Sequence, residues 1–164
     1  MTAPRIRLLR DLALSTCLAA ACLVGPVPHA ARAAEGDAAQ LVGEASRKLR
    51  EEDFVGALRL LEQAVAADPR NPAANVLYQD TTRKLLGVGE LVTRYKTLAA
   101  ESPDDPLLAY LSARLLEPAD AALAFERQAT RFKDSPWPHV GHARALQLLG
   151  KPGDAVAALE RAVL

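Results

Sequence analysis

Residues 54–72, FVGALRLLEQAVAADPRNP, contain the pattern that decides the fold. The apolar residues of this stretch recur at spacings of three and four: Phe54, Ala57, Leu61 and Ala64. Side chains at this spacing share one face of an α-helix, whereas a strand would alternate at every second residue. The stretch ends in Asp68-Pro69-Arg70-Asn71-Pro72. We therefore expect an amphipathic helix that stops before Pro69 and a second helix that begins at Pro72.

The same punctuation recurs along the chain. It is found again as Ser102-Pro103-Asp104-Asp105-Pro106 and as Ser135-Pro136-Trp137-Pro138, and the first two copies are 34 residues apart. In each copy a side chain with an oxygen atom precedes a proline, as in Asn71-Pro72. A side-chain oxygen at the N-cap accepts from free backbone N–H groups, and proline is tolerated at the first helical position. Each copy therefore predicts a helix start.

Further helical stripes lie between these points, and each helix pair contains a short turn. The stripes are Leu91, Tyr95 and Leu98; Ala143, Leu146 and Leu149; and Ala155, Leu159 and Ala162. The turns are Glu52-Asp53, Gly87-Val88-Gly89, Glu117-Pro118 and Gly150-Lys151-Pro152-Gly153. This pattern predicts a helix–turn–helix unit that is used about four times.

The unit resembles the tetratricopeptide repeat over roughly residues 38–164. The resemblance is carried by Ala45, Phe54, Ala57, Leu61, Ala64 and Pro69 in the first unit, and by Ala143, Gly150, Ala155, Leu159 and Ala162 in the last. It implies an all-α fold, a right-handed superhelix of about three and a half antiparallel helix pairs. The units would span about residues 38–71, 72–105, 106–135 and 136–164 of a repeat domain at 34–164.

Two departures from the repeat pattern stand out. Gln79 lies where a small residue is usual, and the third unit is short, so that the register around Ala122, Phe125 and Ala129 stays open.

The final helix has no polar capping helix behind it, although terminal repeats normally need a polar outer face. We expect its face near Val156, Leu159 and Val163 to be exposed, either because the chain is a fragment of a longer array or because this face docks onto a partner or a second copy.

The first 33 residues have the pattern of a secretory signal. Arg5, Arg7 and Arg10 precede the uncharged stretch 12–25, and Ala31-Arg32-Ala33 fits a cleavage site. The apolar run is shorter than a bilayer span. We therefore expect an exported chain, periplasmic or secreted, that starts near Ala34 and has no membrane span. The alternatives are an uncleaved anchor and a lipoprotein attached through Cys22.

The composition argues for packed helices and against several classes of function. Half of the residues are apolar, only 4% are aromatic, and 20 basic residues balance 20 acidic ones. This balance argues against a nucleic-acid partner held by bulk charge. Both cysteines, Cys17 and Cys22, lie in the signal. His139 and His142 are three residues apart but lack a further ligand nearby, so we expect no metal site, no cofactor and no catalytic residue.

The resemblance also implies a concave groove lined by the first helix of each pair. The residues expected to contact a partner there are Arg50, Asp80, Arg83, Lys84, Tyr110, Arg114, Arg144 and Gln147. Arginine and tyrosine are favoured at binding hot spots. We therefore expect a non-enzymatic scaffold of the bacterial cell envelope that binds a peptide or helix of another protein. The alternative is a structural module that self-associates through its C-terminal helix.

Overall fold

The computed structural model describes residues 29–163, which form α-helices joined by short turns, with no strand among them. In chain order the helices are α1 (His29–Arg50), α2 (Phe54–Ala67), α3 (Pro72–Leu86), α4 (Gly89–Glu101), α5 (Pro106–Ala113), α6 (Pro118–Arg131), α7 (Trp137–Leu148) and α8 (Pro152–Val163). Within the described residues they make four helix pairs, α1–α2, α3–α4, α5–α6 and α7–α8.

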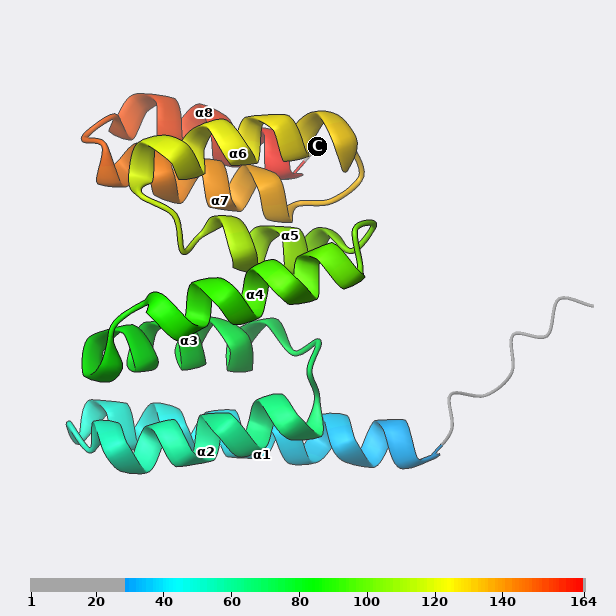
Figure 1. The fold of residues 1–164 in the computed structure, drawn as a ribbon, viewed down its shortest axis with the longest axis vertical. Coiled ribbons are helices and arrows are strands. Elements are labelled where there is room, and N and C mark those ends of the chain that lie inside the picture. The colour runs from blue at the N-terminus through cyan, green and yellow to red at the C-terminus, as the bar shows by residue number, and fades with distance from the viewer. Residues whose placement is uncertain (1–28, 164) are drawn as a thin grey trace, which may run out of the picture.

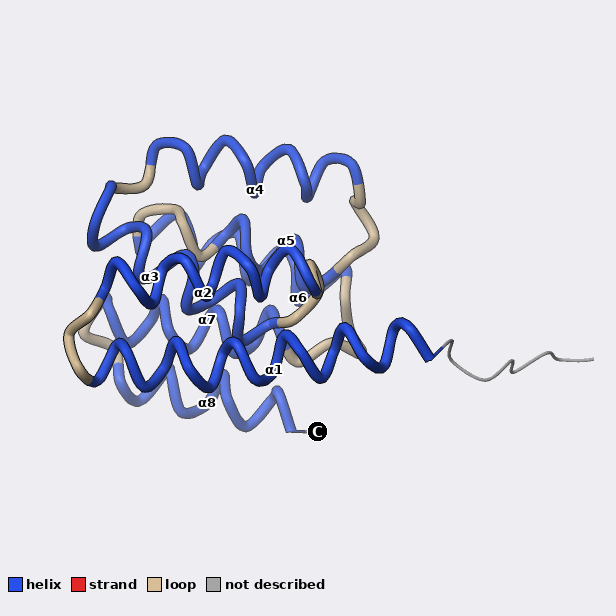
Figure 2. The backbone as a smooth tube through the Cα atoms, turned by 90° about the horizontal axis from the view of Figure 1, so that it is seen from below, coloured by secondary structure: helices blue, strands red, loops and turns tan. Residues whose placement is uncertain are grey.

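The pairs are stacked on one another along the long axis of the molecule (Figure 1). The turns within pairs lie at one edge of the stack and the connections between pairs lie at the other. Viewed along the stack, α4 and α8 lie on opposite sides, so successive pairs are rotated (Figure 2). The predicted all-α solenoid of antiparallel helix pairs is confirmed.

Two of the three predicted N-caps are confirmed. The Asn71 side chain accepts a hydrogen bond from Ala74 N at 3.0 Å, and Asp105 accepts from the backbone N–H groups that open α5. The third differs, because α7 begins at Trp137 and the residue at its cap position is Pro136, which makes no side-chain cap bond. Ser135 Oγ accepts one long bond from Trp137 N at 3.4 Å, and Pro138 has no N–H to add a second.

Small and large apolar residues alternate in the core. Ala57, Leu61 and Ala64 have no exposed surface, as expected for helices that cross closely. Tyr95 of α4 and Phe125 of α6 take the place of Leu61 in the next two units, and they are 0% and 1% exposed. Burial of Phe125 settles the register of the third unit, which the sequence left open.

One glycine is required by packing. A Cβ atom on Gly141 of α7 would collide with the ring of Phe125, so the backbone of α7 lies directly on the largest side chain of α6. Gly87 and Gly150 follow α3 and α7 with φ of 88° and 73°, a conformation that side chains other than glycine rarely adopt.

The predicted signal is only partly covered by the described residues. Residues 1–28, which include Cys17 and Cys22, lie outside them, and the predicted cleavage point after Ala33 falls within α1. Among the described helices, none is both long enough and apolar enough to cross a bilayer.

Candidate functional site

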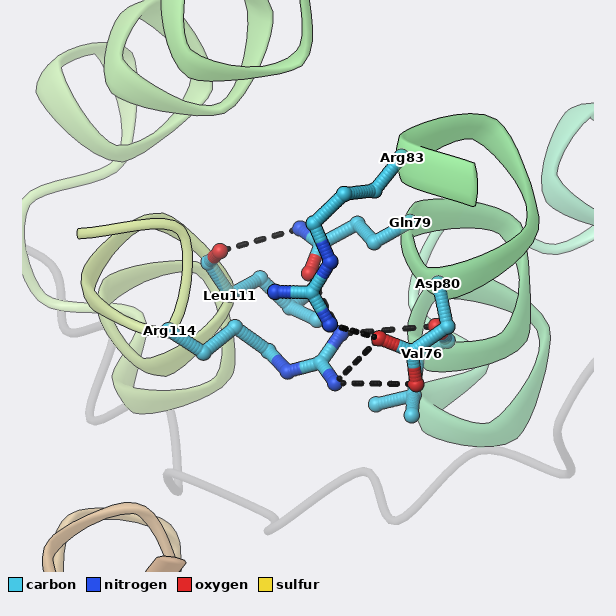
Figure 3. Close-up of polar contacts among 6 residues, drawn as sticks. All are labelled: Val76, Gln79, Asp80, Arg83, Leu111 and Arg114. Atoms are coloured by element: carbon cyan, nitrogen blue, oxygen red, sulfur yellow. Dashed lines mark hydrogen bonds and ion pairs between the residues drawn. The ribbon is translucent and has the colours of Figure 1, made fainter. Parts of the chain in front are cut away.

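Arg114 joins the second and third units through an inward-pointing guanidinium (Figure 3). It lies at the C-terminal end of α5, and its side chain is only 3% exposed. Nη1 donates to Gln79 Oε1 at 2.7 Å, and Nη2 donates to both carboxylate oxygens of Asp80 at 3.1 and 3.2 Å. A longer bond of 3.4 Å reaches the carbonyl oxygen of Val76. All of these acceptors belong to α3, so one side chain connects two units.

The network contains three of the residues expected to contact a partner: Asp80, Arg83 and Arg114. Arg83 also donates to Asp80, at 2.9 Å, so one carboxylate bridges two guanidinium groups. Arg83 is 43% exposed in its side chain, whereas Arg114 is enclosed and its buried Nε has no hydrogen-bond partner. Arg114 was expected to contact a partner in the groove; in the structure its guanidinium binds groups of α3 inside the protein.

Gln79 explains why the repeat pattern fails in the second unit. It is 1% exposed, and its amide nitrogen donates to Leu111 O at 2.9 Å while its oxygen accepts from Arg114. A small residue at this position could neither donate to the Leu111 carbonyl oxygen nor accept from the Arg114 guanidinium. The signal in the sequence was the departure itself, a polar residue where the repeat has a small one.

A second polar contact, centred on Tyr95, ties α4 to α3. The Tyr95 hydroxyl donates to Asn75 Oδ1 at 2.7 Å, and Asn75 Nδ2 donates to the carbonyl oxygens of Pro69 and Asn71. Burial raises the pKa of Tyr95 to about 12, because a tyrosinate would lose its hydration there.

Tyr110 lies one helical turn before Arg114 and belongs to an aromatic group. Its ring centroid is 5.3 Å from that of Trp137 and 5.8 Å from that of Phe125, in tilted arrangements. Tyr110 is 5% exposed, so little of its side chain is available to a partner. The group links α5, α6 and α7 and fixes the wall of the hollow described next.

An open hollow of about 430 Å³ lies over α7, between α5 and α8. It is lined by Tyr110, Val140, Ala143, Arg144, Gln147, Pro152, Ala155, Val156 and Leu159. Three of the predicted contact residues, Tyr110, Arg144 and Gln147, therefore meet at one place. They meet there with Val156 and Leu159, the residues predicted for self-association. The sequence pattern placed these two groups on separate surfaces.

The hollow combines an apolar floor with a polar edge. Val156 and Leu159 are 58% and 46% exposed, which is high for large apolar side chains of a helix that packs on a neighbour. Arg144 and Gln147 are exposed, and Arg144 forms no ion pair with another described residue. This arrangement can take up an apolar side chain and direct a polar group beside it.

The remaining predicted contacts lie elsewhere. Arg50 is exposed at the end of α1. The ammonium group of Lys84 lies 3.4 Å from the centroid of the Phe54 ring, a cation–π contact between α3 and the start of α2. Both residues lie beside the turns within pairs, at the edge of the stack and away from the hollow over α7.

His139 and His142 line a different hollow, together with Glu126 and Arg161. Burial lowers the pKa of His142 below its ordinary value. Among the described residues no three His, Cys, Asp or Glu side chains are grouped so that they could hold a metal ion.

The fold of this chain is similar to that of solved structures. No protein-family model matches the chain, and no curated protein matches it. One similar solved structure is TTC0263, a thermophilic TPR protein of Thermus thermophilus, with 20% identity and a TM-score of 0.49 over 77% of this chain and 73% of that one. Another is MamA MSR-1 C2, with 15% identity and a TM-score of 0.41 over 77% and 75% of the two chains.

Proposed function

We propose that this chain is a non-enzymatic scaffold of the bacterial cell envelope, which binds a peptide or helix of another protein. The observation that carries the proposal is the hollow over α7, where apolar surface at Val156 and Leu159 lies beside Arg144 and Gln147. Exposed apolar area next to an arginine that has no ion-pair partner among the described residues is typical of a protein-binding surface.

The rigidity of the surface supports the same proposal. Tyr110 is held by Phe125 and Trp137, and α5 is held to α3 by Arg114. Side chains that are already fixed lose little conformational entropy when a partner binds. In this proposal Asp80 and Arg83 continue the contact surface beyond α5, and Arg50 and Lys84 lie at its margin.

The test is affinity capture from the native envelope with the full chain and two variants. The first variant combines Arg144→Glu with Gln147→Ala, which changes the edge of the hollow and no buried contact. The control is Arg59→Glu, which places the same charge change on an exposed position of α2. We expect a protein that is recovered with the wild-type chain and the control, and lost with the double variant.

Equal recovery with all three chains would contradict the assignment of the hollow. Arg114 is left unchanged in this test, because its replacement would disturb α3 and α5 as well as any bound partner. Far-ultraviolet circular dichroism of each variant shows whether the helices are retained.

Export to the envelope rests on residues 1–33, and it needs a separate experiment. Mass spectrometry of the chain purified from envelope fractions distinguishes the three predicted outcomes. A chain that begins at Ala34 supports the cleaved signal. An acylated chain that begins at Cys22 would establish a lipoprotein, and an intact N-terminus in the membrane fraction would establish an anchor.

A second proposed function is self-association through the C-terminal helix. The exposure of Val156 and Leu159 favours it. Val163, which was predicted with them, belongs to α8, but its side chain lies outside the described part of the chain.

A further inference from the structure

Three hollows recur along the stack, each between the second helices of two neighbouring units. One lies over α3, between α2 and α4, and the next lies over α5, between α4 and α6. The third lies between α6 and α8 and is the one lined by His139 and His142. The three hollows occupy equivalent places in the repeat, so the residues that line them can be compared directly.

The hollow over α5 differs from the other two in its charge. Its charged residues are Arg127 and Arg131 of α6, and no carboxylate of the described residues lines it. The other two hollows contain both signs of charge: Glu62, Glu90 and Arg94 over α3, and Glu126 and Arg161 between α6 and α8. The lining of the hollow over α5 is therefore the one that favours an anion.

The two arginines of this hollow are available to a ligand. Arg127 forms no ion pair with another described residue. Arg131 lies 2.8 Å from Asp104, but the two side chains are 55% and 92% exposed, and a pair in such contact with water contributes little. The arginines are four residues apart on one helix, so their like charges repel each other. A carboxylate placed between them removes this repulsion and accepts charge-assisted hydrogen bonds.

The base of the hollow over α5 is apolar, and it is open because its side chains are small. Helix α5 forms the base and is the shortest described helix, with 8 residues. The small residues of the lining are Ala99, Ala109, Ser112, Ala113 and Ala124. The volume is about 410 Å³, against about 260 Å³ over α3, where Leu58, Tyr78 and Leu91 take up the space. A hollow of this size can hold part of an extended chain.

The hollow is held in shape from within the stack. Gln128 Nε2 of α6 donates to Ala109 O of α5 at 3.0 Å, which fixes one wall to the base. Preformed walls lower the entropy that a ligand must lose on binding. Helices α4, α5 and α6 belong to the second and third of the four pairs. A helix pair added at either end of the stack would therefore pack against the first or the fourth unit and leave this hollow open.

We propose that the hollow over α5 is a second binding site, which takes an extended acidic segment of a partner protein. An Asp or Glu side chain of the segment lies between Arg127 and Arg131, and small apolar residues beside it cover the alanines of the base. A free anion would use the two guanidinium groups and leave the apolar base in water, so a peptide matches the lining better. No lining residue is shared with the hollow over α7, so this site does not depend on the proposed function.

The first test is fluorescence anisotropy of a labelled octapeptide with blocked ends, which has one Asp and one Glu among alanine and valine residues. The comparison peptide has Asn and Gln in their place. We expect the full chain to bind the acidic peptide about tenfold more tightly than the neutral one, and added salt to reduce the difference. Equal affinity for the two peptides would overturn the proposal, as would an acidic peptide that fails to bind at millimolar concentration.

The role of the arginines is tested by combining Arg127→Gln with Arg131→Gln, which changes two exposed side chains. The matched control is Arg59→Gln, at an exposed position of α2 outside the three hollows. We expect affinity for the acidic peptide to fall about tenfold in the double variant and to stay unchanged in the control. The neutral peptide should bind all three chains alike. An acidic peptide that does not distinguish the three chains would contradict the site.

The apolar base is tested without a change of charge. Ala109→Leu fills the hollow over α5, whereas Ala73→Leu adds the same bulk at an exposed position of α3. We expect only Ala109→Leu to weaken the acidic peptide, with circular dichroism unchanged in both chains. Full affinity in Ala109→Leu would show that the arginines act as a charged surface without the hollow. Displacement of the peptide by inorganic phosphate at constant ionic strength would likewise reassign them to a simple anion.

A last variant separates this site from the hollow over α7. The chain with Arg144→Glu and Gln147→Ala leaves every lining residue of the hollow over α5 in place. We expect it to bind the acidic peptide as the wild-type chain does. A loss of binding there would move the peptide to the hollow over α7 and overturn the second site. Failure of the envelope capture would count against the proposed function, and the peptide measurements would still decide this one.

Discussion

At the scale of single residues, Arg114 has the largest role in joining the units. A guanidinium that is only 3% exposed needs acceptors within the protein, and Gln79, Asp80 and Val76 supply them for its two Nη atoms. The contact is specific, because the fork of the guanidinium fits one amide and one carboxylate at defined positions on α3.

We expect Arg114→Leu to destabilise the protein by about 2–3 kcal/mol, since it leaves Gln79 Oε1 buried without a donor. The lower end applies if water reaches Asp80, which is 36% exposed. The matched change is Arg83→Ala, which removes an exposed bond to the same carboxylate and should cost less than about 1 kcal/mol. Urea unfolding of the two variants gives the comparison, and equal losses would contradict the role of burial.

Alanine at Gly141 should lower the stability of the protein, whereas alanine at Gly43 should raise it. Gly141→Ala should cost about 1–3 kcal/mol, because the added methyl group collides with the Phe125 ring and must move α7. Gly43→Ala in α1 should stabilise by about 0.5–1 kcal/mol, because its Cβ meets no atom within 4 Å and alanine favours the helix. Thermal unfolding measures both. A gain in Tm for Gly141→Ala would show that the contact with Phe125 is loose.

Tyr95 predicts a loss of stability in alkali. The pKa of its hydroxyl is raised to about 12 in the folded chain against an ordinary value of 10, so the unfolded chain releases the proton first. The stabilising effect of the neutral hydroxyl is complete below pH 10 and is lost as the pH rises toward 12. Tyr95→Phe should be less stable at neutral pH, since Asn75 loses a donor, and should lose less between these pH values. Parallel denaturation curves at both pH values test this, and identical pH dependence would contradict it.

At the scale of helices, the positions of the starts and turns could be predicted because they depend on neighbours in sequence. Pro72 and Pro106 open α3 and α5 as expected, and Gly87 ends α3. The start of α7 was predicted at Pro136 but lies one residue later, at Trp137, which has a proline on either side. Helix ends thus follow from local chemistry wherever one proline acts alone.

Asp105 is the cap with the most partners. It accepts from Leu107 N and Leu108 N, and its other oxygen lies 2.8 Å from Arg70 Nη2. We expect Asp105→Ala to cost about 1–2 kcal/mol through the loss of the cap. Glu117→Ala at the start of α6 should cost less than about 0.5 kcal/mol, because Glu117 makes no side-chain cap bond. Chemical denaturation of the pair tests this; a larger loss in Glu117→Ala would contradict it.

At the scale of the whole molecule, the sequence could place residues on a face but not decide what that face contacts. Arg83, Arg114 and Arg144 were all expected to contact a partner in the groove, yet Arg114 is enclosed because the short α5 ends where α3 offers a carboxylate and an amide. The hollow was not predicted either. It brings Tyr110 and Leu159 to one place only through the stacking of α5, α7 and α8.

Helices α6 and α8 allow a prediction about the ends of the stack. They hold equivalent places, but α6 is covered by α7, whereas the outer face of α8 is open. We expect amide hydrogens of α8 to exchange faster than those of α6 at concentrations where the chain is monomeric. Exchange measured by mass spectrometry at low and high concentration tests this, and slow exchange in α8 under both conditions would contradict an open face.

The Arg114 network also bears on how such a chain can change by duplication. A helix pair begins and ends at the same edge of the stack, so a pair can be copied or deleted in a gene without moving the rest of the chain. Deleting residues 72–105 would remove every acceptor of Arg114, and inserting a pair after Glu101 would separate Arg114 from them. A change in repeat number that keeps this network must therefore copy or delete the second and third units together, or leave both in place.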